Sequence, residues 1–353
     1  MSGSAILLTL LILAVLILVH EFGHFLAAKA VGVRVDEFAL GLFGPKLASF
    51  KRGETEYTIR LFVVLGGFVR MAGMNPEEPD YDNPCGFNRQ PVWARAVVLA
   101  AGPAMNFLLA ILFFSILAGA YGVSVPQAAP AQIGQIIEGL PAAQAGFQSG
   151  DIVVSIDGQP VKDWNDLQTI IHASRDKALR FNVLRGKEKT PTTLTVTPAA
   201  SEQDVSMGAI GVLPVTQIRR VGPGGSLLYG ASQTWDATTM WFRSLGLMLA
   251  RRTRAELVGP VGISRQVQMA MDMGMAPVLW LSAILSATVG LINLLPVPAL
   301  DGGRLAFLAV ERVRGRPVDP ARENFIHLIG FALLILLGLF ITYKDIMGLG
   351  TPS

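Results

Sequence analysis

Two histidines and a glutamate near the N-terminus have a spacing that suits metal chemistry. His20 and His24 lie four residues apart in the stretch His-Glu-Phe-Gly-His, with Glu21 directly after the first histidine. Four residues make about one helical turn, so both imidazoles face the same way and can bind one divalent cation. Zinc held by two histidines and a carboxylate activates a water molecule, and a neighbouring glutamate can take that water's proton. The motif therefore indicates a zinc hydrolase.

The helix that must carry this motif is apolar. Residues 5–19 contain no charged side chain, so the motif closes a hydrophobic helix of membrane-spanning type. On a soluble helix the same five residues could be exposed side chains without a function. Next to a span, however, ionisable side chains are costly to bury, by about 2.5 kcal/mol or more for a central charge, and they mark functional sites. We therefore expect a metal site at membrane depth.

The composition is that of a membrane protein. The 353 residues are 51% hydrophobic and 16% charged, with a mean hydropathy of +0.48, which indicates a polytopic membrane protein rather than a soluble enzyme. The net charge of +3 is small and the basic residues are scattered, so nucleic acid is not an expected partner. Cys85 is the only cysteine, which excludes an internal disulfide and a thiolate zinc cluster. The N-terminal apolar run lacks a basic leader and a small-residue cleavage site, so we interpret it as a span and not a signal peptide.

Four windows are long enough to cross the lipid bilayer: residues 5–30, 92–121, 276–296 and 324–343. The short connections 31–91 and 304–322 are rich in arginine and lysine, which predicts that both are cytoplasmic. With four spans, both termini and the long segment 122–275 then lie on the extracytoplasmic side. The protein is thus expected to be multi-pass.

Residues 33–72 predict neither a helix nor a simple loop. The stretch from Tyr57 to Leu65 is rich in β-formers, and Gly66-Gly67 interrupts it before Phe68. We therefore expect a β-hairpin or small sheet. It should lie against the active-site helices, because non-helical backbone at membrane depth must be covered by protein or water. An exposed strand edge there could pair with an unwound substrate by strand addition. The alternative is a solvated cytoplasmic hairpin.

Between the second and third windows, residues 126–213 predict a separate α+β domain. Strands are expected at 133–137 and 151–156, a short helix at 141–146, an amphipathic helix at 164–173 and a second hairpin from 180–184 and 192–197. The pattern resembles a PDZ domain, a class that captures peptide ends by strand addition. The following segment, 214–275, has the arginines and tryptophans of an interfacial amphipathic helix.

The third window ends in a polar, proline-rich stretch from Asn293 to Asp301. Pro296 and Pro298 remove backbone donors and force the helix to open. The predicted topology brings Asp301 to the same membrane depth as His20 and His24. His327 in the fourth window lies at that depth as well, so depth alone leaves two candidates for a third ligand. In the second window, Asn106 could hydrogen-bond across to another helix, and we interpret it as a residue of the helix packing.

In order along the chain, these motifs resemble the site-2 protease family of intramembrane zinc metalloproteases. The residues that carry the resemblance are His20-Glu21-x-x-His24, Gly66-Gly67-Phe68-Val69, Gly102-Pro103-Ala104-x-Asn106, the PDZ-like insert and Asn293-x-x-Pro-x-Pro-x-Leu-Asp301-Gly. The resemblance implies Zn2+ bound by His20, His24 and Asp301, with Glu21 as general base and Asn293 near the scissile carbonyl. It is closest to the bacterial regulator of sigma-E protease branch, whose best-known members carry two tandem PDZ domains where this chain fits one.

The same resemblance implies regulated intramembrane proteolysis in the bacterial cytoplasmic membrane. The expected substrates are single-pass membrane proteins already trimmed outside the membrane, such as anti-sigma factors or signal peptide remnants. Substrate ectodomains or peptide ends would meet the PDZ-like domain on the extracytoplasmic side.

The fold class expected is a polytopic α-helical membrane protein with four spans, a membrane-associated hairpin or sheet, and an inserted α+β PDZ-like domain. Its segments are residues 1–121 and 276–353 as the membrane core, 126–213 as the PDZ-like domain and 214–275 as the interfacial segment. Two other functions remain: a zinc-binding membrane transporter, for which no paired halves are visible in the sequence, and a non-catalytic PDZ scaffold, which would not need the full set of catalytic residues.

Overall fold

The computed structural model describes residues 2–61, 66–75, 77–127, 129–186, 188–201, 206–249 and 258–347. The chain divides into two compact units. The first, the helical unit, comprises residues 1–117, 223–238 and 256–353, and the second, the PDZ-like unit, comprises 118–222 and 239–255.

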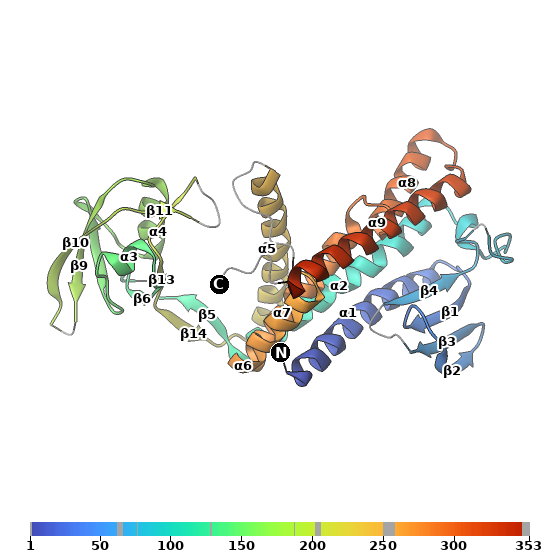
Figure 1. The fold of residues 1–353 in the computed structure, drawn as a ribbon, viewed down its shortest axis with the longest axis horizontal. Coiled ribbons are helices and arrows are strands. Elements are labelled where there is room, and N and C mark those ends of the chain that lie inside the picture. Colours follow the sequence, from blue (N-terminus) through green and yellow to red (C-terminus); the bar gives the residue numbers. More distant parts are fainter. Residues whose placement is uncertain are drawn as a thin grey trace. The chain divides into compact units, whose positions relative to one another are not determined.

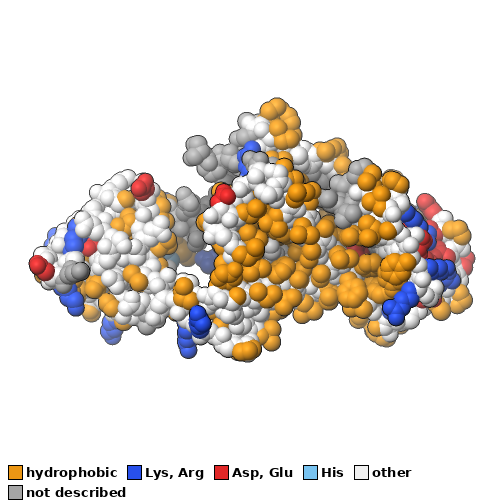
Figure 2. Space-filling model, turned by 90° about the horizontal axis from the view of Figure 1, so that it is seen from below, with side chains coloured by type: hydrophobic (Ala, Val, Ile, Leu, Met, Phe, Trp, Pro, Cys, Tyr) orange, Lys and Arg blue, Asp and Glu red, His pale blue; other side chains and the backbone are white. Residues whose placement is uncertain are grey.

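Four helices of the described chain are long and apolar enough to cross a membrane, as the sequence predicted (Figure 1): α1 (Gly3–Ala30), α2 (Val92–Tyr121), α7 (Met275–Leu294) and α9 (Pro320–Ile346). Helices suit this task because every interior backbone N–H and C=O is paired within the segment. On the face drawn in Figure 2, hydrophobic side chains form a broad surface over the helical unit. Large exposed apolar residues such as Leu7, Leu112 and Leu336 belong to these helices and suit contact with lipid.

Further helices lie between the spans in the sequence: α5 (Pro223–Leu249), α6 (Pro260–Met273), α8 (Asp301–Arg314) and the 3-10 turn η2 (Phe87–Arg89). The predicted interfacial segment thus contains two described helices and a strand. The glycine- and proline-rich stretch 258–263 contains the start of α6, and Pro260 stands in the first turn of that helix. The carboxylate of Asp345 in α9 accepts the N–H groups of Gly259 and Gly262, both at 2.9 Å, and so caps this helix.

The β-rich region is a four-stranded sheet built from β1 (Val35–Leu40), β2 (Lys46–Arg52), β3 (Thr55–Arg60) and β4 (Gly67–Met71). The order across the sheet is β2-β3-β1-β4, with β1 parallel to β3 and antiparallel to β4. The two stretches that suggested a hairpin, β3 and β4, therefore do not pair with each other, because β1 lies between them. Residues 62–65 of the expected strand lie outside the described residues.

The PDZ-like unit has a core of its own, including Phe181, Ile133 and Leu167, all at most 1% exposed. Helix α4 (Trp164–Ala173) has the bounds expected from the sequence, and Asp163 caps it by accepting the N–H of Asp166 at 3.0 Å. The remaining elements are α3 (Pro141–Gln144) and the strands β5 (Val123–Pro126), β6 (Ile133–Ile136), β7 (Ile152–Ile156), β8 (Gln159–Pro160), β9 (Leu179–Arg185), β10 (Thr190–Val196), β11 (Ala199–Ala200), β12 (Gly208–Ala209), β13 (Val212–Pro214) and β14 (Thr216–Arg219).

The main sheet of this unit has the order β10-β9-β7-β8. A separate two-stranded ribbon joins the beginning and the end of the unit, because β5 pairs antiparallel with β14 from Val123 opposite Arg219 to Pro126 opposite Thr216. This ribbon extends beyond both boundaries, 126 and 213, that the sequence suggested for the domain.

Candidate metal centre

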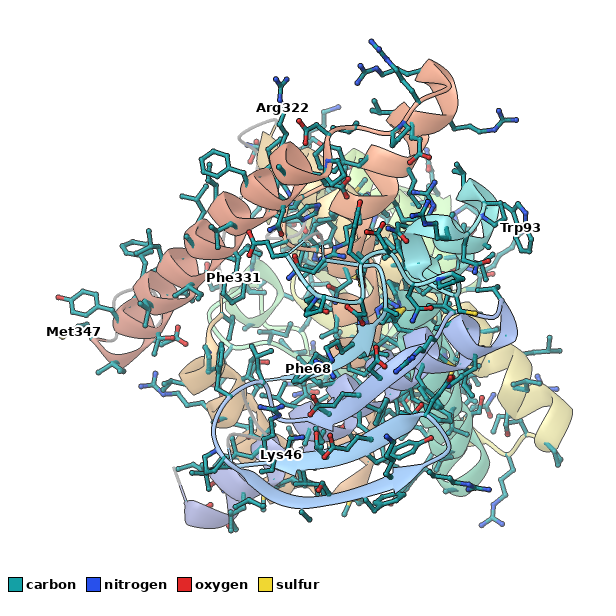
Figure 3. The ribbon with its side chains drawn as sticks, turned by 90° about the vertical axis from the view of Figure 1, so that its right-hand side faces the viewer. Lys46, Phe68, Trp93, Arg322, Phe331 and Met347 are labelled. Carbon is teal, nitrogen blue, oxygen red and sulfur yellow. The ribbon has the colours of Figure 1, made fainter. Side chains whose placement is uncertain are left out.

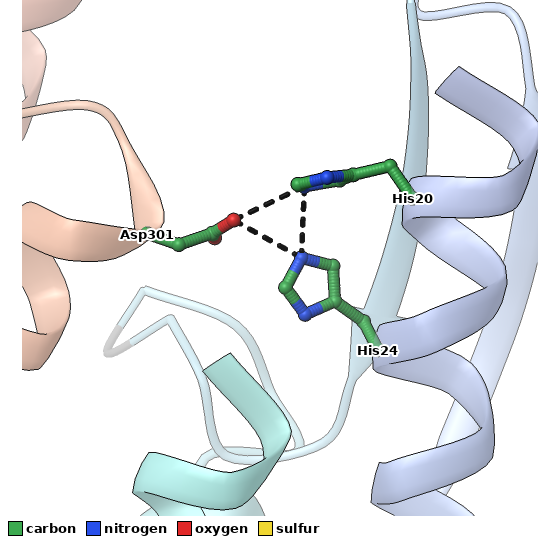
Figure 4. A group of neighbouring side chains, drawn as sticks. All are labelled: His20, His24 and Asp301. Carbon is green, nitrogen blue, oxygen red and sulfur yellow. Dashed lines mark hydrogen bonds and ion pairs between the residues drawn. The ribbon is translucent and has the colours of Figure 1, made fainter. Parts of the chain in front are cut away.

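His20, His24 and Asp301 meet at one point of the helical unit (Figure 4). Asp301 Oδ2 lies 3.1 Å from His20 Nε2 and 3.2 Å from His24 Nε2, and the two nitrogens are 3.2 Å apart. A tetrahedral zinc ion with bonds of about 2.0–2.1 Å separates its ligand atoms by about 3.3 Å. The triangle therefore has the size of one face of a tetrahedral zinc site, and two imidazoles with one carboxylate are ligands that zinc accepts.

The two histidines are fixed by the helix that carries them. Both are on the buried side of α1, with His20 8% and His24 6% exposed. His24 Nδ1 lies 2.8 Å from the backbone oxygen of Val98 in α2, so Nδ1 carries the hydrogen and donates it. The Nε2 lone pair of His24 is then directed at the site, which is the tautomer that metal binding requires.

Glycines let α2 come close to this helix. A Cβ on Gly23 of α1 would overlap the backbone oxygen of Ala101, and a Cβ on Gly102 of α2 would overlap His24 Nε2 and lie 2.9 Å from His20 Nε2. Because Gly102 has no side chain, the space beside both Nε2 atoms stays open. The sequence alone does not show that Gly102 lies beside the histidines, because this depends on which face of α2 is turned to His24.

Asn106, which the sequence assigned to contacts between helices, lies within hydrogen-bond distance of His20 in α1 and faces the site. It is fully buried, and its Nδ2 lies 3.2 Å from His20 Nδ1, while its Oδ1 has no hydrogen-bond partner among the described residues. Turning the amide by 180° places Oδ1 at His20, where it accepts the Nδ1–H and leaves Nε2 free for a metal. The hydroxyl of Ser286 in α7 donates to the backbone oxygen of Asn106 at 2.8 Å and holds this turn of α2 in place.

Asp301 reaches the site from the segment that follows α7. The helix ends at Leu294, as the prolines predicted, and α8 begins at Asp301 itself. A Cβ on Gly302 would overlap the backbone oxygens of Leu294 and Leu295, and one on Gly303 would overlap that of Val297. Both glycines are therefore required for the chain to fold back tightly and aim the carboxylate at the histidines.

His327 does not join the triangle. Its Nδ1 accepts the backbone N–H of Ala299 at 2.8 Å, and Ala299 has a left-handed backbone with φ of 76°. Gly330, one turn along α9, packs against Pro298, because a Cβ there would lie 2.5 Å from the proline Cβ. Helix α9 thus packs against the segment that carries Asp301.

Glu21 lies between the metal triangle and the sheet. Its Cγ would be 3.2 Å from a Cβ on Gly67, the first residue of β4, and it lies within electrostatic reach of His20, His24 and Asp301. The residue is partly buried, so water can approach one side of it.

The structure does not bring Asn293 into contact with this group. Its side chain donates to the backbone oxygen of Val289 one turn earlier in α7, at 3.0 Å. The residue is partly buried at the last turn before the helix opens.

Comparisons with known proteins agree on one family. The sequence pattern of Peptidase family M50 matches residues 8–337. The zinc metalloprotease RasP of Oceanobacillus iheyensis is 33% identical, over 96% of this chain and 98% of that protein. The regulator of sigma-W protease RasP of Bacillus subtilis is 31% identical, over 99% of this chain and 100% of that protein. The PDZ domain of the SdrC-like protein from Listeria innocua is 19% identical over 24% of this chain and 93% of that domain, with a TM-score of 0.22.

Proposed function

The chain belongs to Peptidase family M50, an intramembrane zinc metalloprotease family, and from this premise we propose that His20, His24 and Asp301 bind its zinc ion and that Glu21 is the general base. The observation that carries this assignment is the triangle of three ligand atoms with edges of 3.1–3.2 Å. Val98, Asn106 and Gly102 support it by fixing the imidazoles and leaving space beside them.

Different residues of the chain carry out different steps of the proposed peptide hydrolysis. When bound, zinc acidifies a water molecule and polarises the peptide carbonyl. A carboxylate oxygen of Glu21 takes the proton from the attacking water and returns it to the nitrogen of the leaving amine. Asn293, at the open end of α7, would turn its amide from Val289 toward the peptide and donate to the scissile carbonyl.

The substrate must be extended at the site, because a helical peptide keeps its amide groups in internal hydrogen bonds. Strand β4 provides a template. It pairs with β1 on one side, has no strand partner on the other among the described residues, and begins at Gly67 beside Glu21. We propose that an unwound transmembrane segment adds to this free edge and so passes the general base in extended form.

The substrates that fit are single-pass membrane proteins whose external parts have been removed, including anti-sigma factors and signal peptide remnants. The membrane is the bacterial cytoplasmic membrane in this proposal. The basic connections 31–91 and 304–322 support a cytoplasmic position for both, which puts the PDZ-like unit and both termini on the extracytoplasmic side.

Gly102→Ala tests the ligand set, because the added methyl group occupies the space beside both Nε2 atoms. We expect zinc affinity to fall by roughly 10–100-fold, the range seen when a metal site's supporting groups are changed. Hydrolysis of a transmembrane peptide in detergent should fall with it, as it should when a chelator is added to the unaltered protein. Gly338→Ala in α9 is the matched control, since no atom lies within 4 Å of its added Cβ. A folded Gly102→Ala protein with unchanged zinc affinity would place the metal elsewhere.

Removal of the PDZ-like unit tests whether it selects substrates or takes part in catalysis. We propose replacing residues 127–215 by an Asn-Gly turn, since Pro126 lies opposite Thr216 and the ribbon β5–β14 can then close as a two-residue hairpin. Cleavage of a short transmembrane peptide should stay within about twofold of the intact protein's rate, because no proposed catalytic residue is removed, whereas cleavage of substrates with bulky external domains should increase. If the short peptide were no longer cut by a folded, zinc-loaded variant, the unit would belong to the catalytic machinery.

A further inference from the structure

A cavity of about 290 Å3 lies among the ends of α2, α8 and α9, apart from the metal triangle. Its wall includes Arg95, Arg304, Glu311, Glu323 and His327. Arg304 and His327 also line an adjoining hollow with Glu77, Leu328 and Phe331. None of these side chains is a proposed metal ligand or the proposed general base.

Arg304 is the arginine of this wall that no carboxylate of the described residues holds by a hydrogen bond or ion pair, although Asp301 and Glu323 lie within its electrostatic reach. Arg95 is held by both carboxylate oxygens of Glu311, one of them at 3.0 Å, and Arg89 at the cavity wall donates to Asp82 at 3.0 Å. Among the described residues, no hydrogen bond or ion pair reaches the guanidinium of Arg304, although the residue is partly buried. An arginine carries five N–H donors, and those of Arg304 are available to a ligand in the cavity.

His327 adds a second unused donor to the same space. Because its Nδ1 accepts the N–H of Ala299, the ring hydrogen of the neutral imidazole is on Nε2. Nε2 is buried without a hydrogen-bond partner among the described residues, and its ion-pair neighbour, Glu323 Oε1, is 4.0 Å away. Arg304 and His327 therefore both present donors, and no acceptor, to one cavity.

We propose that this cavity, the Arg304 cavity, binds the phosphate of an anionic phospholipid headgroup. A phosphate oxygen pair matches the fork of a guanidinium, and basic pockets between spanning helices are suited to anionic headgroups. The surroundings favour a lipid over a soluble anion, because Leu328 and Phe331 of the adjoining hollow are 63% and 41% exposed on a spanning helix. Figure 3 shows Phe331 between Arg322 and Met347, which lie toward opposite ends of α9, so acyl chains can follow this helix from the headgroup.

Glu323 provides a direct test of the proposal. Among the described residues, it is the carboxylate of the cavity wall that no arginine holds within ion-pair distance. Glu323 lies within electrostatic reach of Arg304 and competes with any added anion for it. If the site binds phosphate, Glu323 repels the ligand, and neutralising it must strengthen binding.

The experiment titrates the purified full-length chain, in a non-ionic detergent, with dioleoylphosphatidylglycerol and in parallel with dioleoylphosphatidylcholine, and counts bound lipid by native mass spectrometry. We expect one tightly retained phosphatidylglycerol. Arg304→Gln should weaken its binding about tenfold or more, since charge-assisted hydrogen bonds are lost. His327→Asn, which keeps an acceptor for Ala299 but removes the Nε2 donor, should weaken it by a smaller factor. Glu323→Gln should tighten it.

Arg312→Gln is the matched control, because Arg312 is exposed on the same helix and lies outside the cavity wall. Equal losses in Arg304→Gln and Arg312→Gln would reduce the effect to general surface attraction and overturn the proposal. So would weaker binding in Glu323→Gln, or binding of glycerol 1-phosphate as tight as that of the lipid. A higher KM for a transmembrane peptide in Arg304→Gln with unchanged lipid retention would assign Arg304 to the substrate instead.

Discussion

Replacing Glu21 by glutamine is expected to leave zinc bound and to lower peptide hydrolysis by about 10²–10⁴-fold, the usual contribution of a general base. The amide has nearly the shape of the carboxylate, so its contact with Gly67 and the position of α1 should not change. It cannot accept a proton from the attacking water. The variant should therefore contain as much zinc as the unaltered protein, measured by atomic absorption, but should cleave a transmembrane peptide far more slowly.

The informative control for Glu21→Gln is the unaltered protein stripped of metal by a chelator. Both samples should be inactive, but only the stripped protein should recover when zinc is added back. Near-normal turnover by Glu21→Gln would show that another group takes the proton, and the assignment of Glu21 would be wrong.

Replacing Asp301 by asparagine is expected to remove zinc and activity together. The substitution preserves the size of the side chain, so α8 can still begin at this residue, but a neutral amide oxygen is a poor zinc ligand. Loss of one of three protein ligands should reduce affinity by more than the roughly 10–100-fold that supporting residues contribute. Titration with a competing chelator measures this directly.

His327→Asn is the matched control for Asp301→Asn, because the asparagine oxygen can accept the N–H of Ala299 in place of Nδ1. Zinc stoichiometry should stay at that of the unaltered protein. If His327→Asn lost its metal while Asp301→Asn retained it, His327 would be the third ligand and the 295–300 segment would serve another purpose.

The sequence is most informative where one pattern has one physical solution. Apolar runs of about the length that a bilayer requires predicted α1, α2, α7 and α9, and the amphipathic period of 164–173 predicted α4 to the residue. The two prolines after Asn293 likewise predicted where α7 ends. In each case the local chain decides the local structure.

Pairing and orientation were harder, because they depend on parts of the chain distant in sequence. Nothing within Tyr57–Met71 reveals that β1 inserts between β3 and β4, which is why a hairpin remained a reasonable expectation. The orientation of Asn106 depends on the rotation of α2 against α1, set by close contact at Gly23 and Gly102. A buried amide in a span indicates a hydrogen bond, but its partner follows only from that packing.

The antiparallel ribbon between β5 and β14 has a consequence for how the gene can change. Because these strands hold the two ends of the insert side by side, up to Pro126 and Thr216, the length of chain between them can vary without moving either end. The entropic free-energy cost of closing such a loop rises by only about 0.6 kcal/mol for each doubling of its length. The end of the ribbon is therefore a position at which a whole domain can be inserted, removed or exchanged by in-frame recombination. The sequence of the helical unit does not need to change for this.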